Sequence, residues 1–219
     1  MSELLQEISA ALQEGKAKVV KALVENALAD GVSAKAILEE GLLSAMDVIA
    51  VKFKNNEVYV PEVLIAARAM NTGTALLKPH LAEEGAQAVG KALLGTVKGD
   101  LHDIGKNIVR MMFEGKGIEV VDLGVDVPVE KFVEAYHAEK PDVVALSALL
   151  TTTMGEMKSA VEAFAEAGIR DNVVIMIGGA PVTDSFCKSI GADIYTPDAA
   201  TAAEAAKQAI LKRKEGESV

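Results

Sequence analysis

The chemistry that this sequence can perform is most apparent at residues 99–105, which read GDLHDIG. Asp100 and His102 stand two positions apart there, so the carboxylate can accept a hydrogen bond from one imidazole nitrogen and leave the other nitrogen free. A metal-ligating histidine is oriented and made more basic in this way. Gly105 would let a bulky group approach the backbone closely. The pattern is equally compatible with a histidine that is merely satisfied by its neighbours.

Other patterns of metal-binding or catalytic residues are weaker. His80 and His137 lack partners at metal-ligand spacing, and Cys187 is the single cysteine, so a zinc site is not expected. Glu134 and His137 form half of a di-iron pattern, but the sequence holds no second copy. The sequence also lacks the glycine motifs that bind nucleotide phosphates. A general acid/base pair in an unrelated α/β enzyme stays open as an alternative for the Asp–His pair.

The composition argues against several classes of partner. The formal net charge of −10 and the 4% aromatic content do not suit a surface that binds nucleic acid. No apolar stretch approaches the roughly 20 residues of a membrane helix. The acidic, amphipathic first residues do not resemble a signal peptide, and the single Cys187 fits a reducing compartment. We therefore expect a cytoplasmic protein that binds neither nucleic acid nor membranes.

Residues 91–219 alternate between short apolar runs and amphipathic stretches. Continuously apolar runs are typical of strands that are covered on both faces. Five alternations predict an α/β domain with a doubly wound, five-stranded parallel sheet of the Rossmann-like or flavodoxin-like kind. The expected strands are 92–97, 120–121, 143–146, 173–177 and 193–195. The expected helices are a stretch beginning near Ile104, then 128–137, 153–167, 182–189 and 199–212.

Ligands of such a sheet bind beyond the carboxyl ends of the strands. The Asp–His pair follows the first predicted strand, which places it at that edge. The other loops expected at the same edge are 124–128, 147–153, 178–181 and 196–199. The function should therefore be sought where these loops gather.

The first 84 residues follow a different pattern, with apolar residues at the 3.6-residue period of helices. Leu5, Ile8 and Leu12 share one helix face, Ser33 can cap a later helix, and Pro61 suits the first turn of the last one. Four amphipathic helices with short connections predict a small bundle. The expected organisation is a helical cap domain at 1–84, a linker at 85–90 and the α/β domain at 91–219.

The stretch TVKGDLHDIGKNIV, residues 96–109, resembles the cobalamin-binding motif of methionine synthase and of the corrinoid proteins of methanol, methylamine and methoxyaromatic methyltransferases. Ser147-Ala148-Leu149 matches the S-x-L segment of that family, and Gly178-Gly179 matches its paired glycine. The helical half is similar as well, because Phe53 and Val60-Pro61-Glu62-Val63 resemble the cap over the upper face of the cobalt. The resemblance thus spans nearly the whole chain.

This resemblance implies a cobalamin bound base-off and His-on, with His102 as the lower axial ligand of the cobalt. Asp100 would hold His102, and Thr153 stands where the family often has a hydroxyl that continues the relay. Small residues would line the slot for the detached nucleotide tail. The cofactor-binding residues that the resemblance implies are Gly99, Asp100, Leu101, His102, Asp103, Gly105, Ser147, Leu149, Thr151, Thr153, Gly178, Gly179 and Ala199, with Phe53, Val60 and Val63 in the cap.

Several of these residues also have a plainer interpretation. Ser147 and the paired glycines suit ordinary turns at strand ends. The threonines at 151–153 can cap a helix. Phe53 continues the helical core period of Ile49.

The function implied by the resemblance is that of a methyl carrier that does not turn over alone. A substrate-specific methyltransferase would move a methyl group to cob(I)alamin, a second methyltransferase would pass it to tetrahydrofolate or coenzyme M, and a reductive activase would serve the system. Methanol, methylamines, betaines and methoxylated aromatics all stay open as donors. The alternatives are the cobalamin-binding subunit of a mutase, against which the bundle and cap speak, and a cobalamin-dependent regulator, for which no DNA-binding segment is apparent.

Overall fold

The structure, a computed structural model, describes residues 3–84 and 88–216. The chain divides into two compact units, one formed by Met1–Ala88 with Gly115–Gly117 and the other by Val89–Glu114 with Ile118–Val219. Half of the linker predicted at 85–90, residues 85–87, lies outside the described residues, and its last residue, Gly90, begins the first strand. None of the helices in the described ranges is both long and apolar enough to span a membrane.

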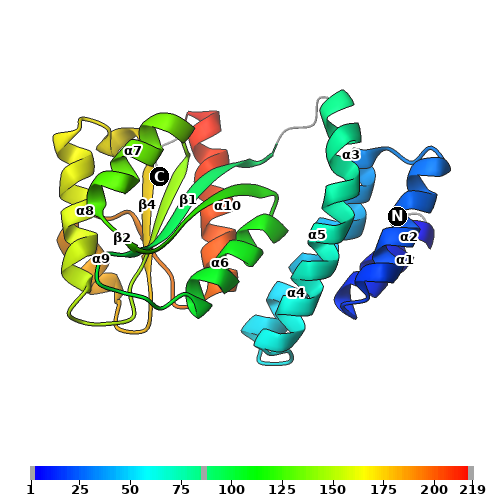
Figure 1. Cartoon of the computed structure of the whole chain (residues 1–219), viewed down its shortest axis with the longest axis horizontal. Coiled ribbons are helices and arrows are strands. Elements are labelled where there is room, and N and C mark those ends of the chain that lie inside the picture. Colours follow the sequence, from blue (N-terminus) through cyan, green and yellow to red (C-terminus); the bar gives the residue numbers. More distant parts are fainter. Residues whose placement is uncertain (1–2, 85–87, 217–219) are drawn as a thin grey trace. The chain divides into compact units, whose positions relative to one another are not determined.

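The N-terminal unit is the predicted helical bundle (Figure 1). Its elements are α1 (Glu3–Gln13), α2 (Ala17–Ala29), α3 (Ala34–Ala36), the π-helical η1 (Ile37–Leu43), α4 (Ser44–Lys54) and α5 (Val60–Glu83). The short α3 runs without a break through η1 into α4, so the described part of this unit contains four continuous helical rods. Ser33 caps the third rod as predicted, because its hydroxyl accepts the Ala36 N–H at 3.2 Å.

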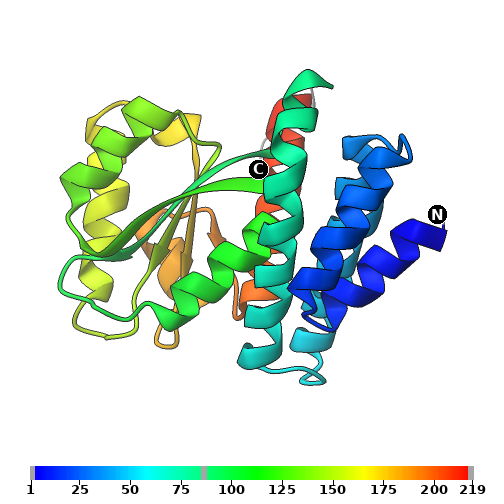
Figure 2. The same ribbon diagram turned by 45° about the vertical axis from the view of Figure 1, so that its right-hand side comes forward.

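The C-terminal unit is a five-stranded parallel sheet with helices on both faces (Figures 1 and 2). Its strands are β1 (Gly90–Val97), β2 (Ile118–Val127), β3 (Val143–Ser147), β4 (Val174–Gly178) and β5 (Ile194–Tyr195). Its helices are α6 (Ile104–Gly115), α7 (Val129–Glu139), α8 (Met154–Glu166), η2 (Arg170–Asn172), α9 (Asp184–Ile190) and α10 (Ala199–Glu215). The strand order is β2-β1-β3-β4-β5, which confirms the predicted doubly wound fold.

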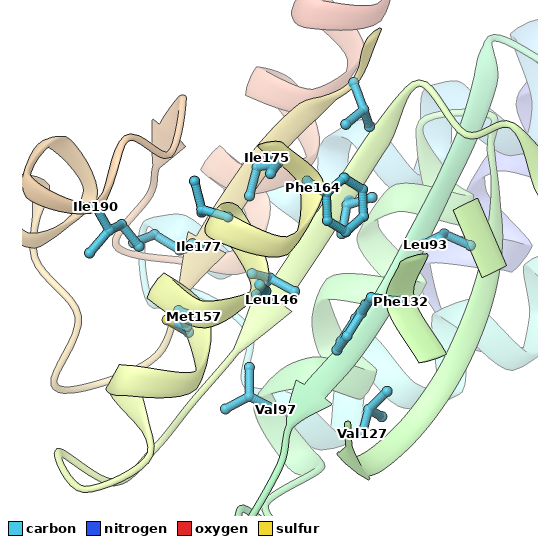
Figure 3. Packing of buried hydrophobic residues seen from close by; sticks show 14 of the residues in the cluster. Leu93, Val97, Val127, Phe132, Leu146, Met157, Phe164, Ile175, Ile177 and Ile190 are labelled. Carbon is cyan, nitrogen blue, oxygen red and sulfur yellow. The ribbon is translucent and has the colours of Figure 1, made fainter. Parts of the chain in front are cut away.

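A large hydrophobic cluster of this unit lies between the sheet and the helices α7, α8 and α9 (Figure 3). Phe132 of α7 and Phe164 of α8 are fully buried against apolar strand residues. Gly95 of β1 makes room for this packing, since a Cβ there would lie 2.7 Å from Cζ of Phe132.

The second strand differs from the sequence-based expectation. β2 was expected to cover only 120–121, with a loop at 124–128, but it extends to Val127. Gly124 and Asp126 have positive φ values of 89° and 53°, and the pairing of β2 with β1 shifts register beside them. The turn-forming residues that suggested a loop instead produce bulges within the strand.

The end of β4 supplies a stability test. Gly179 has φ +136°, and a Cβ there would lie 1.8 Å from the Ala148 carbonyl oxygen. Gly179→Ala should therefore lower the free energy of unfolding by about 2 kcal/mol or more, as measured by denaturant unfolding of the cofactor-free protein. The matched variant Gly178→Ala meets only an ordinary contact, 3.9 Å from the Thr196 carbonyl oxygen, and should change stability by less than about 1 kcal/mol. Equal effects would contradict the backbone geometry at Gly179.

Candidate functional site

Residues 98–103, which we call the Asp–His loop, leave β1 through a tight turn. Gly99 has φ +79°, a conformation that glycine adopts without strain, and the Asp100 N–H donates to the Val97 carbonyl at 3.1 Å. The Thr96 hydroxyl of β1 donates to the His102 carbonyl at 2.8 Å. These contacts fold the loop back on the end of its own strand, so that His102 stands at the carboxyl edge of the sheet.

Asp100 and His102 make the contact that their spacing predicts. The Nδ1 atom of His102 lies 2.6 Å from Oδ1 of Asp100, and the same oxygen accepts the His102 backbone N–H at 3.1 Å. The Asp100 side chain has no exposed surface, whereas half of the His102 side chain is exposed (0% and 50%). No hydrogen bond to Nε2 of His102 comes from the described residues. That nitrogen is thus available to a ligand.

The second oxygen of Asp100 is held by the loop that follows β3. Oδ2 accepts the backbone N–H groups of Leu149 and Leu150 at 2.7 and 3.2 Å. The Thr153 hydroxyl lies 2.9 Å from the same oxygen and 2.9 Å from the Leu150 carbonyl, and its one proton can serve either acceptor. The structure therefore joins His102, Asp100 and Thr153 in one chain of polar contacts.

The surroundings of Asp100 keep its carboxyl group ionised. Burial alone would raise the pKa of Asp100, but the donors around it outweigh that effect. They are the Leu149 N–H, the ring and backbone N–H of His102 and the Thr153 hydroxyl, and together they lower the pKa well below its usual range. An ionised Asp100 favours the His102 tautomer with a proton on Nδ1, which leaves the lone pair on Nε2.

Large apolar side chains are exposed around this polar centre. Leu101 is 71% and Ile104 is 70% exposed, and Val125, Leu149 and Leu150 also retain substantial exposed surface. An apolar group that binds here would remove this surface from water, which is favourable. Ile104, Val125 and Leu150 were not among the sequence-predicted site residues. The available signal was the presence of bulky apolar residues in segments where loops are normally polar.

The small predicted residues lie at the ends of neighbouring strands. Ser147 pairs with Thr96 of β1 on one side and with Gly178 of β4 on the other. The Ala148 N–H donates to the Gly178 carbonyl at 3.2 Å, and the backbone at Gly179 approaches that of Ala148 too closely for a side chain. Backbone segments therefore stand side by side here without bulky groups between them.

Three further predicted residues have simple positions in this unit. Thr151 is exposed, and Gly105 lies in the first turn of α6 with open space beside it. Ala199 begins α10, where Asp198 caps the helix by accepting the Thr201 N–H at 2.7 Å. No contact recorded for Ala199 joins it to the Asp–His pair. Asp103 does not face that pair either, because its side chain accepts from Asn107 at 3.2 Å.

The predicted cap residues belong to the helical unit. Phe53 lies in the last turn of α4 and Val60 in the first turn of α5, and both are half-buried. Val63 has no exposed surface. The role of these three residues over the upper face of the cobalt stays a prediction.

The donor groups fit a metal that arrives with most of its own ligands. Within residues 3–84 and 88–216, no group of three or more His, Cys, Asp or Glu side chains could hold a metal ion. A corrin ring supplies four nitrogen ligands to cobalt, so the protein would need to supply only one further ligand. One free imidazole nitrogen, surrounded by exposed apolar side chains and by side-chain-free backbone, satisfies that requirement.

Comparison with known proteins identifies the family of this chain. Two models of the B12 binding domain match, one at residues 90–207 and the other at residues 4–78. The chain is 42% identical to the dimethylamine corrinoid protein of Methanosarcina barkeri, over 97% of both chains. It is 40% identical to the trimethylamine corrinoid protein of the same organism, over 95% of this chain and 97% of that protein.

A solved structure extends the likeness to three dimensions. The crystal structure of the methanol:cobalamin methyltransferase complex from Methanosarcina barkeri matches with a TM-score of 0.86 and 31% identity. The match covers 96% of this chain and 80% of that chain. The protein belongs to the corrinoid proteins of methyltransferase systems, which carry methyl groups on a cobalamin cofactor. The family, the cofactor and the methyl-carrier function predicted from the sequence are confirmed.

Because the groups around Asp100 donate hydrogen bonds to its carboxylate, we expect the free energy of unfolding to depend on pH. In Asp100→Asn, the amide NH2 would face donors only, which should lower the free energy of unfolding by about 1–3 kcal/mol near neutral pH. The folded-state pKa of Asp100 is lowered, so the stability it contributes is complete above the unfolded-state pKa of about 3.9 and is lost as the pH falls through the folded-state pKa.

The difference in free energy of unfolding between wild type and Asp100→Asn should therefore shrink as the pH is lowered from about 6 to about 3. Denaturant unfolding of the cofactor-free protein measures this difference. Asp103→Asn is the matched control, because Asp103 is exposed and lies in the same loop. A constant difference across this pH range would show that Asp100 is not held ionised by its donors.

Proposed function

We propose that this chain binds its corrinoid base-off with His102 as the lower axial ligand, and that the methyl group it carries comes from a methylamine. The observation that carries the first part is the free Nε2 of a half-exposed His102 whose Nδ1 is bonded to a buried, ionised Asp100. When bound, the corrinoid supplies a cobalt that accepts a methyl group and gives it up again.

The residues of the chain would orient and tune the lower ligand. Asp100 keeps the proton of the imidazole on Nδ1 and thereby directs the Nε2 lone pair outward. Thr153 can direct its hydroxyl proton to Asp100 or to the Leu150 carbonyl, because both acceptors lie 2.9 Å away. A proton that moves towards Asp100 weakens its pull on the imidazole and makes Nε2 a poorer donor. This chain of contacts can therefore adjust the axial ligand to the charge of the metal.

The slot for the detached nucleotide tail is proposed along the ends of β3 and β4. Ser147 and Thr151 offer hydroxyl groups there, and the described residues provide no hydrogen-bond partner for either. Gly178 and Gly179 leave the backbone bare, which suits the passage of a flat base. Ala199, at the start of α10, would border the same slot with a small side chain.

The donor is inferred from the relatives. The two methylamine-named corrinoid proteins are 42% and 40% identical to this chain, whereas the matched chain of the methanol complex is 31% identical. Substrate recognition in such systems resides in the partner methyltransferase, so this difference supports a surface fitted to a methylamine-specific partner. A second methyltransferase, acting on tetrahydrofolate or coenzyme M, and a reductive activase would complete the system.

Replacement of the axial ligand tests the first part of the proposal. In wild-type protein labelled with 15N-histidine, loaded with cobalamin and reduced to Co(II), the EPR spectrum should show coupling to one 15N nucleus, which distinguishes a protein ligand from the 14N base of the cofactor. His102→Ala should remove that coupling, because no other described imidazole stands at this edge of the sheet. His137→Ala is the matched control, since His137 is exposed in α7, and it should leave the spectrum unchanged. Retained coupling in His102→Ala would refute His102 ligation.

A partner assay tests the donor. The reduced, cobalamin-loaded protein would be mixed separately with methyltransferases specific for dimethylamine, trimethylamine and methanol, each with its substrate. The absorption of the reduced cofactor should disappear at least about ten times faster with one of the amine systems, which corresponds to about 1.4 kcal/mol of preference. The demethylated amine should form in step. A reaction with the methanol system alone would refute a methylamine donor.

A further inference from the structure

Asp126, near the end of β2, adopts an unusual backbone conformation. Its φ of +53° lies in the left-handed region, which costs a non-glycine residue roughly 1 kcal/mol and is best tolerated by Asn and Asp. The side chain is exposed, so it is not held there by the packing of the core. A strained residue at the edge of a ligand site suggests that its conformation serves the site.

The conformation of Asp126 lets it bind the Asp–His loop in two directions. Its Oδ1 accepts the Gly99 N–H at 2.7 Å, and its own backbone N–H donates to the Asp100 carbonyl at 2.9 Å. The two bonds hold Gly99 and Asp100, which lie three and two positions before the ligand histidine. The Asp126 carboxylate makes no other hydrogen bond or ion pair with the residues that the structure describes.

The segment of β2 that carries Asp126 is itself held in place. Oδ1 of Asp122, also in β2, accepts the Gly124 N–H at 2.9 Å and stabilises the bulge that precedes Asp126. Oδ2 of Asp122 accepts from the buried Lys106 ammonium at 2.5 Å. Lys106 lies in the first turn of α6, just beyond His102. The loop is thus held at both ends against β2.

Asp100 is consequently held from two strands. The loop after β3 binds its carboxylate through Leu149 and Leu150, whereas β2 binds its carbonyl through Asp126. From the β2 side, the Asp126 contacts are the ones that reach Gly99 and Asp100 directly. Without the Asp126 carboxylate, Gly99 would lose the acceptor of its N–H, and the backbone that carries Asp100 would be held less firmly behind the His102 ring.

We propose that Asp126 is a positioning residue for the lower axial ligand: it fixes the backbone of Gly99 and Asp100 and thereby aims Nε2 of His102 at the cobalt. This inference rests on the proposed His102 ligation. It assigns a role in the cofactor site to a residue outside the predicted set. Asp126 makes no hydrogen bond with the His102 ring or with the small residues at the ends of β3 and β4.

The test measures how easily an external base replaces His102. Protein labelled with 15N-histidine and loaded with Co(II) cobalamin would be titrated with 14N-imidazole. A 15N ligand splits the EPR lines into doublets and a 14N ligand into triplets, so the two ligands are distinguished in one spectrum. Asp126→Gly keeps the left-handed backbone and removes only the acceptor for Gly99, and Asp126→Asn keeps a side-chain oxygen and removes the charge.

In Asp126→Gly, the imidazole concentration at half-replacement should fall by about ten-fold, the equivalent of one hydrogen bond. Asp126→Asn should stay within about two-fold of wild type. An Asp126→Gly midpoint equal to that of wild type would overturn the positioning role. A midpoint in Asp126→Asn as low as that in Asp126→Gly would also overturn it, because charge would then be the cause. A wild-type spectrum without the 15N doublet would instead refute His102 ligation itself.

A second measurement needs no cofactor. The Gly99 amide of the cofactor-free protein should exchange with deuterium about ten-fold faster in Asp126→Gly than in wild type, since its acceptor is lost. The Leu149 amide, which bonds to Asp100 from the other side, serves as the internal reference. Unchanged exchange at Gly99 would overturn the inference even if cofactor loading of the variant failed.

Discussion

The carboxylate of Asp100 is the group on which the rest of the site depends. It is fully buried, and its recorded partners are all donors: two backbone N–H groups from the β3–α8 loop, the Thr153 hydroxyl, and the ring and backbone of His102. A buried charge without these partners would be costly enough to become protonated or to open the loop. With them, the charge joins loops from separate strands and determines which imidazole nitrogen faces outward.

The strand order makes this convergence possible. β1 lies between β2 and β3, so a residue that follows β1 can be reached from the ends of both neighbours. The chain crosses from one side of β1 to the other between β2 and β3, and such a switch point leaves a crevice at the carboxyl edge of the sheet. Phe132 packs against Gly95 of β1. The Thr96 hydroxyl at the end of β1 bonds to the His102 carbonyl, so His102 projects from a loop that is held on both sides.

The sequence predicted the parts of this site that depend on side-chain identity. The Asp–His spacing, the apolar strands and the paired glycines each have a physical signature in the amino-acid pattern. The partners of Asp100 do not, because a backbone N–H such as that of Leu149 is common to almost every residue type, and only the folded register brings it within 2.7 Å. The same limit explains the error in β2, where Gly124 and Asp126 are turn formers whose positive φ values are used within a bulged strand.

In the proposed site, affinity for the corrinoid and precise orientation of His102 as the axial ligand would arise from different features. Leu101 and Ile104 are 71% and 70% exposed, which is a cost that an apolar ligand would relieve, so this surface would supply affinity that depends little on angle. Hydrogen bonds depend strongly on angle, and they are concentrated on Asp100, behind the imidazole. A change in an apolar residue should therefore alter how much cofactor is bound, whereas a change behind the imidazole should alter how the bound cobalt behaves. A methyl carrier requires this separation, because its cofactor must stay bound while the axial bond adapts to each charge state of the metal.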